Sequence, residues 1–345
     1  MKKALLAILA VAACSVAANA NVYGDVNGDG DVTVVDVTAV YNYLLDGDET
    51  FLATSDIDGD GYITVADITI IYNIILGEVS PEEPPAPVTE YTVNGVTFKM
   101  VEVEGGTFMM GIDQHIGSAY PAHEVTLSTY SIGQTEVTQE LWVAVMGTNP
   151  SYFNEYGNAE VHSDSHSSWD AGINLQRPVD YVNYGDCLEF CAKLNEMTGK
   201  NFRLPTEAEW EFAVRGGNLT HGYEYAGSDS INDVAWYKST LPSPTLWTDG
   251  WGTQTVATKA PNELGIYDMC GNVDEWCSDW FATYGAEPID PQTNPTGPET
   301  GTYRVMRGGN CITTNPGIMK VYYRQWQNPD SRGNARGLRL AMSAE

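Results

Sequence analysis

Residues 262–276 read NELGIYDMCGNVDEW, and within this run Asp268 and Glu275 lie seven residues apart around Gly271. A turn at the glycine can bring both carboxylates to one place, and hard cations such as calcium prefer oxygen ligands of this kind. The run therefore predicts either a calcium site or a strut in which Glu275 accepts hydrogen bonds from neighbouring backbone N–H groups. Both interpretations make this part of the chain structural.

Other strings accompany this run in a fixed order along the chain. They are GGTFMMG at 105–111, EVT at 136–138, RLPTEAEWE at 203–211, RGG at 307–309 and GLRL at 337–340. In order and spacing they resemble the formylglycine-generating-enzyme family, or sulfatase-modifying factors, over about residues 91–343. The resemblance implies an α+β fold with little regular structure, related to C-type lectin-like domains, and we expect this domain to span residues 91–345.

The resemblance also implies calcium in this domain. In the family, a side chain just before a Gly-Asn step, two backbone carbonyls and a glutamate form one site. These positions correspond to Asp268, Gly271, Val273 and Glu275.

The catalytic copper of the family is expected to be missing. Family enzymes oxidise a sulfatase cysteine to formylglycine with Cu(I) held by two cysteine thiolates, five residues apart, downstream of Arg-Gly-Gly. Those positions fall near Thr313 and Ile318, and soft thiolates are what selects Cu(I). Cys311 lies two positions too early and has no second cysteine after it, so it is the one weak catalytic candidate.

These residues support three functional hypotheses. The first is a non-catalytic protein for ligand binding or assembly. The second is a formylglycine-generating oxidoreductase that depends on copper and acts on sulfatase cysteines. The third is a structural lipoprotein of an envelope machine.

Three helices are expected in the large domain, from about Thr138 to Met146, from roughly Tyr184 to Met197, and over residues 206–213. Thr206 and Glu209 have the spacing of a capping box at the start of the third helix. The second helix carries Cys187 and Cys191 on its apolar face, which favours core packing over metal binding. His162 and His166 have a zinc-like spacing, but their serine-rich surroundings indicate a loop.

A tandem repeat precedes this domain, because residues 25–36 are nearly repeated at 56–67. Alternate oxygen-bearing residues, with a glycine at the sixth position, match a calcium-binding loop in each copy, and the seventh position supplies a backbone carbonyl. The predicted ligands are Asp25, Asn27, Asp29, Asp31, Thr33 and Asp36, then Asp56, Asp58, Asp60, Tyr62, Thr64 and Asp67. Helical spacing of apolar residues follows each loop, and the two apolar faces are expected to pack on one another.

The repeat, residues 22–78, resembles a type I dockerin, a small all-α, EF-hand-like module of loop plus following helix. The resemblance implies calcium, a cohesin-like or other surface docking partner, and polysaccharide metabolism. Apolar residues at Val34-Val35 and Val65-Ala66 stand where dockerins often carry hydroxyls, which leaves the partner open. The proline-rich residues 79–90 are predicted to be an extended linker.

Residues 1–20 have the basic start, apolar run and A-x-A end of a signal peptide, which predicts export. The stretch ending at Cys14 also resembles a lipobox, so the alternative is a lipid anchor on this cysteine. No segment is apolar enough to be a transmembrane helix.

The formal net charge of −29 argues against nucleic acid as a partner. Fifteen acidic residues and no Lys or Arg occur between Asn21 and Glu90. Aromatic residues of the large domain could form a glycan- or protein-binding surface or belong to the core: Trp236, Tyr237, Trp247, Trp251, Trp280, Tyr322, Tyr323 and Trp326. Arginines near the C-terminus could meet an anionic ligand or form internal salt bridges, as the family does: Arg307, Arg324, Arg332, Arg336 and Arg339.

Overall fold

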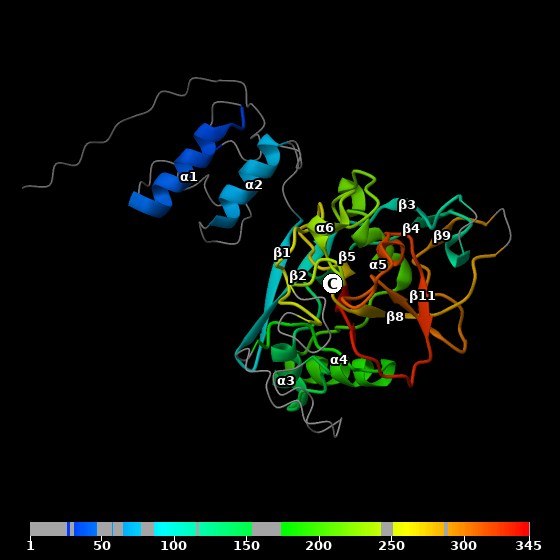
Figure 1. Cartoon of the computed structure of the whole chain (residues 1–345). Coiled ribbons are helices and arrows are strands. Elements are labelled where there is room, and N and C mark those ends of the chain that lie inside the picture. The colour runs from blue at the N-terminus through cyan, green and yellow to red at the C-terminus, as the bar shows by residue number, and fades with distance from the viewer. Residues whose placement is uncertain are drawn as a thin grey trace, which may run out of the picture. The chain divides into compact units, whose positions relative to one another are not determined.

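The computed structural model divides the chain into two compact units, residues 1–84 and residues 85–345 (Figure 1). The boundary lies inside the predicted linker. The structure describes residues 26–27, 31–46, 57, 65–76, 86–114, 117–153, 174–242, 251–285 and 289–344. Several predicted features lie outside these residues: the signal peptide, Cys14, His162, His166, Trp247, Asp25, Asp29, Asp56, Asp58, Asp60, Tyr62 and Thr64.

The described residues of the first unit form two helices, α1 (Val34–Asp46) and α2 (Val65–Ile75), which pack against one another as their spacing predicted. Its core consists of Val26, Val37, Val40, Ile57, Ile68 and Ile71. The predicted apolar faces are only partly buried, because Tyr41, Leu44, Tyr72 and Ile75 are exposed. Each helix buries one narrow stripe against its neighbour, so apolar residues beside that stripe remain on the surface.

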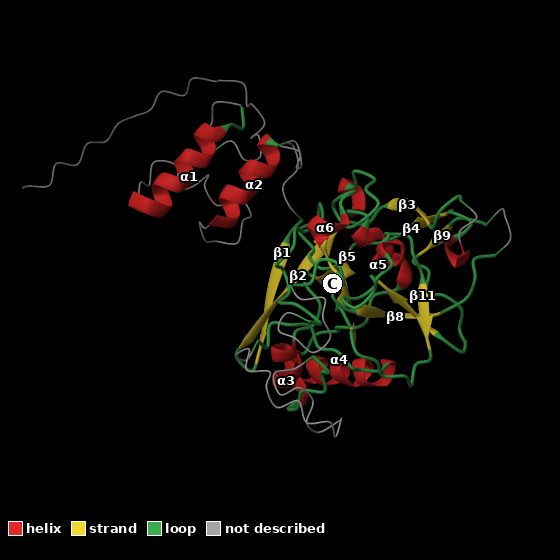
Figure 2. Cartoon of the chain, viewed as in Figure 1, coloured by secondary structure: helices red, strands yellow, loops and turns green. Residues whose placement is uncertain are grey.

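The second unit is α+β, as predicted, and much of it consists of loops between short strands (Figure 2). One sheet has the order β1-β2-β5-β13 and brings the two ends of the unit together. Its antiparallel strands are β1 (Val88–Val93), β2 (Val96–Val103), β5 (Tyr130–Gly133) and β13 (Ala341–Ser343).

A second sheet contains the end of the run at 262–276 and has the order β11-β10-β8-β12. Its strands are β8 (Asp274–Trp280), β10 (Arg304–Arg307), β11 (Gln325–Gln327) and β12 (Arg336–Gly337), of which β12 is parallel to β8. Two smaller sheets contain β3 (Thr107–Met110), β4 (His123–Thr126) and β9 (Gln292–Thr293), and β6 (Ala235–Trp236) with β7 (Cys270–Gly271).

The helices of the second unit are α3 (Gln139–Met146), α4 (Tyr184–Thr198), α5 (Glu207–Val214) and α6 (Ile231–Val234). Short 3₁₀ turns occur at η2 (Gly117–Ala119), η3 (Gly217–Leu219) and η4 (Pro316–Met319). The capping box of Thr206 and Glu209 is formed as predicted. Cys187 and Cys191 lie on the buried face of α4 and pack in the core. Burial raises the pKa of both thiols, which fits a packing role.

Among the described residues, no helix is long and apolar enough to cross a membrane.

Candidate functional site

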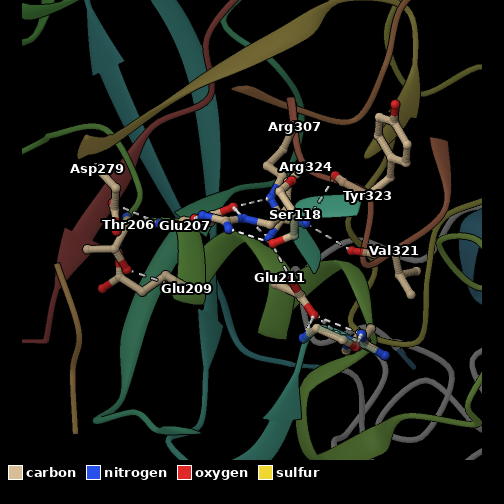
Figure 3. A network of polar contacts seen from close by, with 12 residues as sticks. Ser118, Thr206, Glu207, Glu209, Glu211, Asp279, Arg307, Val321, Tyr323 and Arg324 are labelled. Carbon is tan, nitrogen blue, oxygen red and sulfur yellow. Dashed lines mark hydrogen bonds and ion pairs between the residues drawn. The ribbon is translucent and has the colours of Figure 1, made fainter. Parts of the chain in front are cut away.

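Helix α5 directs Glu207 and Glu211 into a buried network with Arg307 and Arg324 (Figure 3). Arg324 donates from Nε and Nη2 to the two oxygens of Glu207, at 2.6 Å each. Arg307 donates from Nε to Glu207 Oε1 at 3.0 Å and from Nη2 to Glu211 Oε2 at 2.6 Å. Buried ions are tolerated only when partners replace water in this way. The internal salt bridges expected for these two arginines are therefore present.

The arginines decide the protonation of the two glutamates. Burial by itself would raise the pKa of Glu211, but Arg215 and Arg307 outweigh it and lower this pKa to about 2. Burial would also raise the pKa of Glu207, but Arg324 and Arg307 outweigh burial and lower this pKa. Asp279 accepts a hydrogen bond from Glu207 N at 2.9 Å, and burial raises the pKa of Asp279 to about 7. Both glutamates are thus anions at neutral pH.

The network also fixes the Arg-Gly-Gly step. Arg307 Nη1 donates to the carbonyl oxygens of Val321 and Tyr323 at 3.3 and 3.2 Å, which ties β10 to the segment entering β11. Gly309 has a φ of +74°, and a Cβ at this position would lie 2.6 Å from Met319 Cγ. Only glycine therefore fits there without a shift of the neighbouring chain.

The loop after this step contains the positions expected for copper. The backbone carbonyl of Thr313 accepts a hydrogen bond from Lys238 N at 3.1 Å, and the Ile318 side chain packs against the main core. Cys311 is fully buried among Phe153, Trp251 and other apolar side chains. Burial, followed by the charges of nearby carboxylates, raises the pKa of its thiol well above the usual range. A protonated, enclosed thiol is a poor nucleophile and a poor metal ligand.

Glu275 is held by side chains. Arg339 Nη2 donates to Oε1 at 2.7 Å, and Trp210 Nε1 donates to Oε2 at 2.7 Å. Arg339 Nε lies 3.1 Å from both oxygens. The partners of Glu275 are therefore distant side chains, not the neighbouring backbone N–H groups of the strut interpretation. The carboxylate is fully buried and bonded at both oxygens.

Asp268 fits a cation better. It is buried, has a φ of +57°, and accepts from Ala257 N at 2.7 Å through Oδ2, whereas Oδ1 is buried without a hydrogen-bond partner. Burial raises the pKa of Asp268 to about 6. A buried acceptor without a donor is costly unless an ion or water satisfies it.

Glu136 also lies beside the Asp268–Glu275 segment, although the sequence did not predict it there. Its carboxylate accepts from Asn272 Nδ2 at 2.8 Å and Val273 N at 3.1 Å, in direct contact with the Gly-Asn step. Burial raises its pKa, and the charge of Asp268 raises it further. Glu136 and Asn272 are 136 residues apart in the sequence. The EVT string at 136–138 was the one sequence feature that pointed to this position. Among the described residues, no group of three or more His, Cys, Asp and Glu side chains is arranged so that it could hold a metal ion.

In the first unit, the last residue of each predicted loop bonds the second residue of the same loop. Asp36 Oδ1 accepts from Val26 N at 2.9 Å, and Asp67 Oδ1 accepts from Ile57 N at 2.7 Å. Asp36 Oδ2 also accepts from Thr33 N at 2.8 Å. Both aspartates are fully buried. The two copies of the sequence repeat thus make the same hydrogen bond, in which the buried carboxylate at the end of the loop bonds the backbone near its start.

Comparison with known proteins places both units. Residues 87–344 match the family described as "Sulfatase-modifying factor enzyme 1-like domain", and residues 23–76 match "Dockerin type I domain". The chain is 32% identical to "Chaperone protein LppX" of Paenibacillus barcinonensis over 72% of this chain and 90% of that protein. It is 31% identical to "Formylglycine-generating enzyme" of Streptomyces coelicolor, over 71% and 89%.

Solved structures share the fold of the second unit. "Treponema denticola variable protein 1" superposes with a TM-score of 0.63 at 32% identity, covering 74% of this chain and 99% of that one. PvdO from Pseudomonas aeruginosa superposes with a TM-score of 0.57 at 23% identity, over 76% and 100%, which shows the fold alone.

Proposed function

The chain belongs to the sulfatase-modifying factor enzyme 1-like family and carries a type I dockerin domain before that family domain, and from this premise we propose an exported, calcium-stabilised binding or assembly protein without copper-dependent catalysis. The loop after Arg307 supports this proposal most directly. Thr313 and Ile318 occupy the expected copper positions and offer no thiolate, and Cys311 is enclosed in the core as a protonated thiol. Cu(I) sites in proteins are made by soft sulfur ligands.

A formylglycine-generating oxidase is the alternative, which the relative named for that activity favours. The relative named a chaperone has a similar identity, so membership of the family is compatible with other roles.

Cu(I) binding by the purified full chain distinguishes the two functions. We expect no tight Cu(I) binding in competition with a chelator of known affinity, and no oxygen consumption with a cysteine-containing sulfatase peptide. The double variant Thr313→Cys/Ile318→Cys should gain Cu(I) affinity, because it restores two thiolates five residues apart. The single variant Thr313→Cys is the matched control and should gain much less. Tight binding with turnover by the unaltered chain would establish the oxidase instead.

Calcium is proposed in both units. In the first, the two repeated loops would each hold one ion, with Asp36 and Asp67 closing the loops. In the second, Asp268 Oδ1 and the adjacent Glu136 would supply the charged oxygens, together with the backbone carbonyls of Gly271 and Val273. The negative charges of Glu136, Asp268 and Glu275 all act on the Arg339 guanidinium, and a cation would balance the excess negative charge.

Removal of calcium is expected to unfold the first unit and to leave the fold of the second. Clustered carboxylates repel one another without the ion, and the binding energy of the ion is part of the folding energy of such a module. Hydrogen exchange of the full chain with and without chelator measures this, and amides of α1 and α2 should lose their protection. Tryptophan fluorescence reports the second unit separately, because residues 1–90 contain no tryptophan. Full protection of α1 and α2 in chelator would refute the proposal.

Docking is proposed for the first unit, through a cohesin-like or other surface partner. Its helices present exposed apolar side chains that the unit itself does not cover: Val34, Val35, Tyr41, Leu44, Leu45, Tyr72, Ile75 and Leu76. Export through the predicted signal peptide, with a lipid anchor at Cys14 as the alternative, would place this surface outside the cytoplasm. N-terminal analysis of the mature protein separates free secretion from anchoring.

A further inference from the structure

Residues 300–329 carry few charges, and all of these are paired, in a strongly acidic protein. They contain no aspartate or glutamate, although the chain has 46 acidic residues. Their basic side chains all have partners within the molecule. Arg307 and Arg324 bind buried glutamates, Lys320 pairs with Glu224 at 3.0 Å, and Arg304 stacks on the Trp280 ring at 3.6 Å. This stretch therefore presents neither a free cation nor a carboxylate to a ligand.

The same stretch displays aromatic rings. In the described part of the second unit, Tyr303 and Trp326 are the exposed large aromatic side chains, at 42% and 49% exposure. Most other aromatics of the sequence analysis proved buried or half-buried: Trp236, Tyr237, Trp251, Trp280, Tyr322 and Tyr323.

Phe281, Tyr303 and Trp326 lie on one face of the sheet, here called the aromatic platform, because Tyr303 is two residues before Val305, the partner of Trp326 across β10 and β11. Trp326 stacks on Phe281 with ring centroids 4.4 Å apart and planes inclined by 24°. Phe281 N donates to Tyr303 O at 2.8 Å, and the Arg324 guanidinium lies 5.0 Å from the Phe281 ring centroid. The platform is thus attached to the buried network of Figure 3 through Arg324. The stacked rings of Trp326 and Phe281 are held in place before a ligand arrives, which lowers the entropic cost of binding.

Amide side chains lie on the opposite face of edge strand β11. Gln325 and Gln327 precede and follow Trp326, so they point away from the Trp326 ring, and both are half-buried. Gln325 Nε2 donates to Asp274 Oδ1 at 2.7 Å, which fixes the orientation of that amide. The platform itself is therefore formed by flat rings, which suit a ligand that has an apolar face.

We infer that the aromatic platform binds an uncharged carbohydrate chain. This inference rests on the proposed binding function and names its ligand class. An anionic polymer would be repelled by the net charge of −29 and would meet no available cation here, and a cationic partner would find no carboxylate within residues 300–329. Sugar rings carry C–H faces that stack on tryptophan and tyrosine without requiring charge.

Isothermal titration of the full chain with uncharged hexasaccharides of β-1,4-linked glucose, xylose and mannose tests the inference. At least one should bind, and hexagalacturonate, the charged comparator, should not. Trp326→Ala should weaken binding about tenfold and Tyr303→Ala by a similar factor, because each removes one stacking ring. Trp326→Phe keeps a ring and should retain most of the affinity.

Leu188→Ala is the matched control, because Leu188 is an equally exposed apolar residue of the second unit, at 47%. It should leave the affinity unchanged. Absence of binding to every uncharged sugar, preference for hexagalacturonate, or an affinity indifferent to Trp326→Ala would each overturn the inference. Copper and oxygen measurements on the same protein test the proposed function independently, so failure of one can be told from failure of the other.

Discussion

Arg307→Ala is expected to lower the free energy of unfolding of the second unit by about 3–5 kcal/mol. The guanidinium is fully buried and bonds Glu207 and Glu211, so its loss leaves two buried carboxylates short of partners. It also leaves the carbonyl oxygens of Val321 and Tyr323 without this donor. Denaturant unfolding followed by tryptophan fluorescence measures the change, since all nine tryptophans lie in this unit.

Arg332→Ala is the matched control. Arg332 pairs with Asp186 at 2.6 Å, but its side chain is 41% exposed. Exposed ion pairs contribute roughly 0–1 kcal/mol, so the control should unfold almost like the unaltered chain. Equal losses of unfolding free energy for Arg307→Ala and Arg332→Ala would show that burial does not determine how much the network contributes to stability.

Acidification from pH 8 to about pH 5 is expected to stabilise the second unit. Burial raises the pKa of Asp180 from 3.8 to about 7 and that of Asp279 to about 7. Between pH 4 and 7 the folded chain therefore retains protons that the unfolded chain releases, so stability falls as pH rises through this window. The pKa difference corresponds to at most roughly 4 kcal/mol for each group.

The trend should reverse at lower pH. The pKa of Glu211 is lowered from 4.5 to about 2, so the stability that Glu211 contributes is present above pH 4.5 and is lost as pH falls toward 2. Denaturant unfolding at a series of pH values locates the maximum, which we expect near pH 5. Asp279→Asn should flatten the slope between pH 5 and 8. Stability that climbs steadily from pH 5 to pH 8 would contradict the assignment.

Much of this architecture was predictable because its signals are local in sequence. Thr206 and Glu209 are three residues apart, so their capping box needs only the geometry of one helical turn. The loops that end at Asp36 and Asp67 repeat at fixed spacing, and the helices after them follow from apolar periodicity. The absence of cysteine at Thr313 and Ile318 is likewise a property of the sequence itself.

The sequence alone determined that the chain has dockerin-like repeats, a family domain and no thiolate pair. Only the tertiary structure decided which charges meet. Glu275 is bonded by Arg339, 64 residues away, and Glu207 by Arg324, 117 residues away. Glu136 accepts from Asn272, 136 residues away, across loops with no regular period. Side-chain identity states what a group can bond, but burial and pairing between distant segments depend on how the whole chain packs.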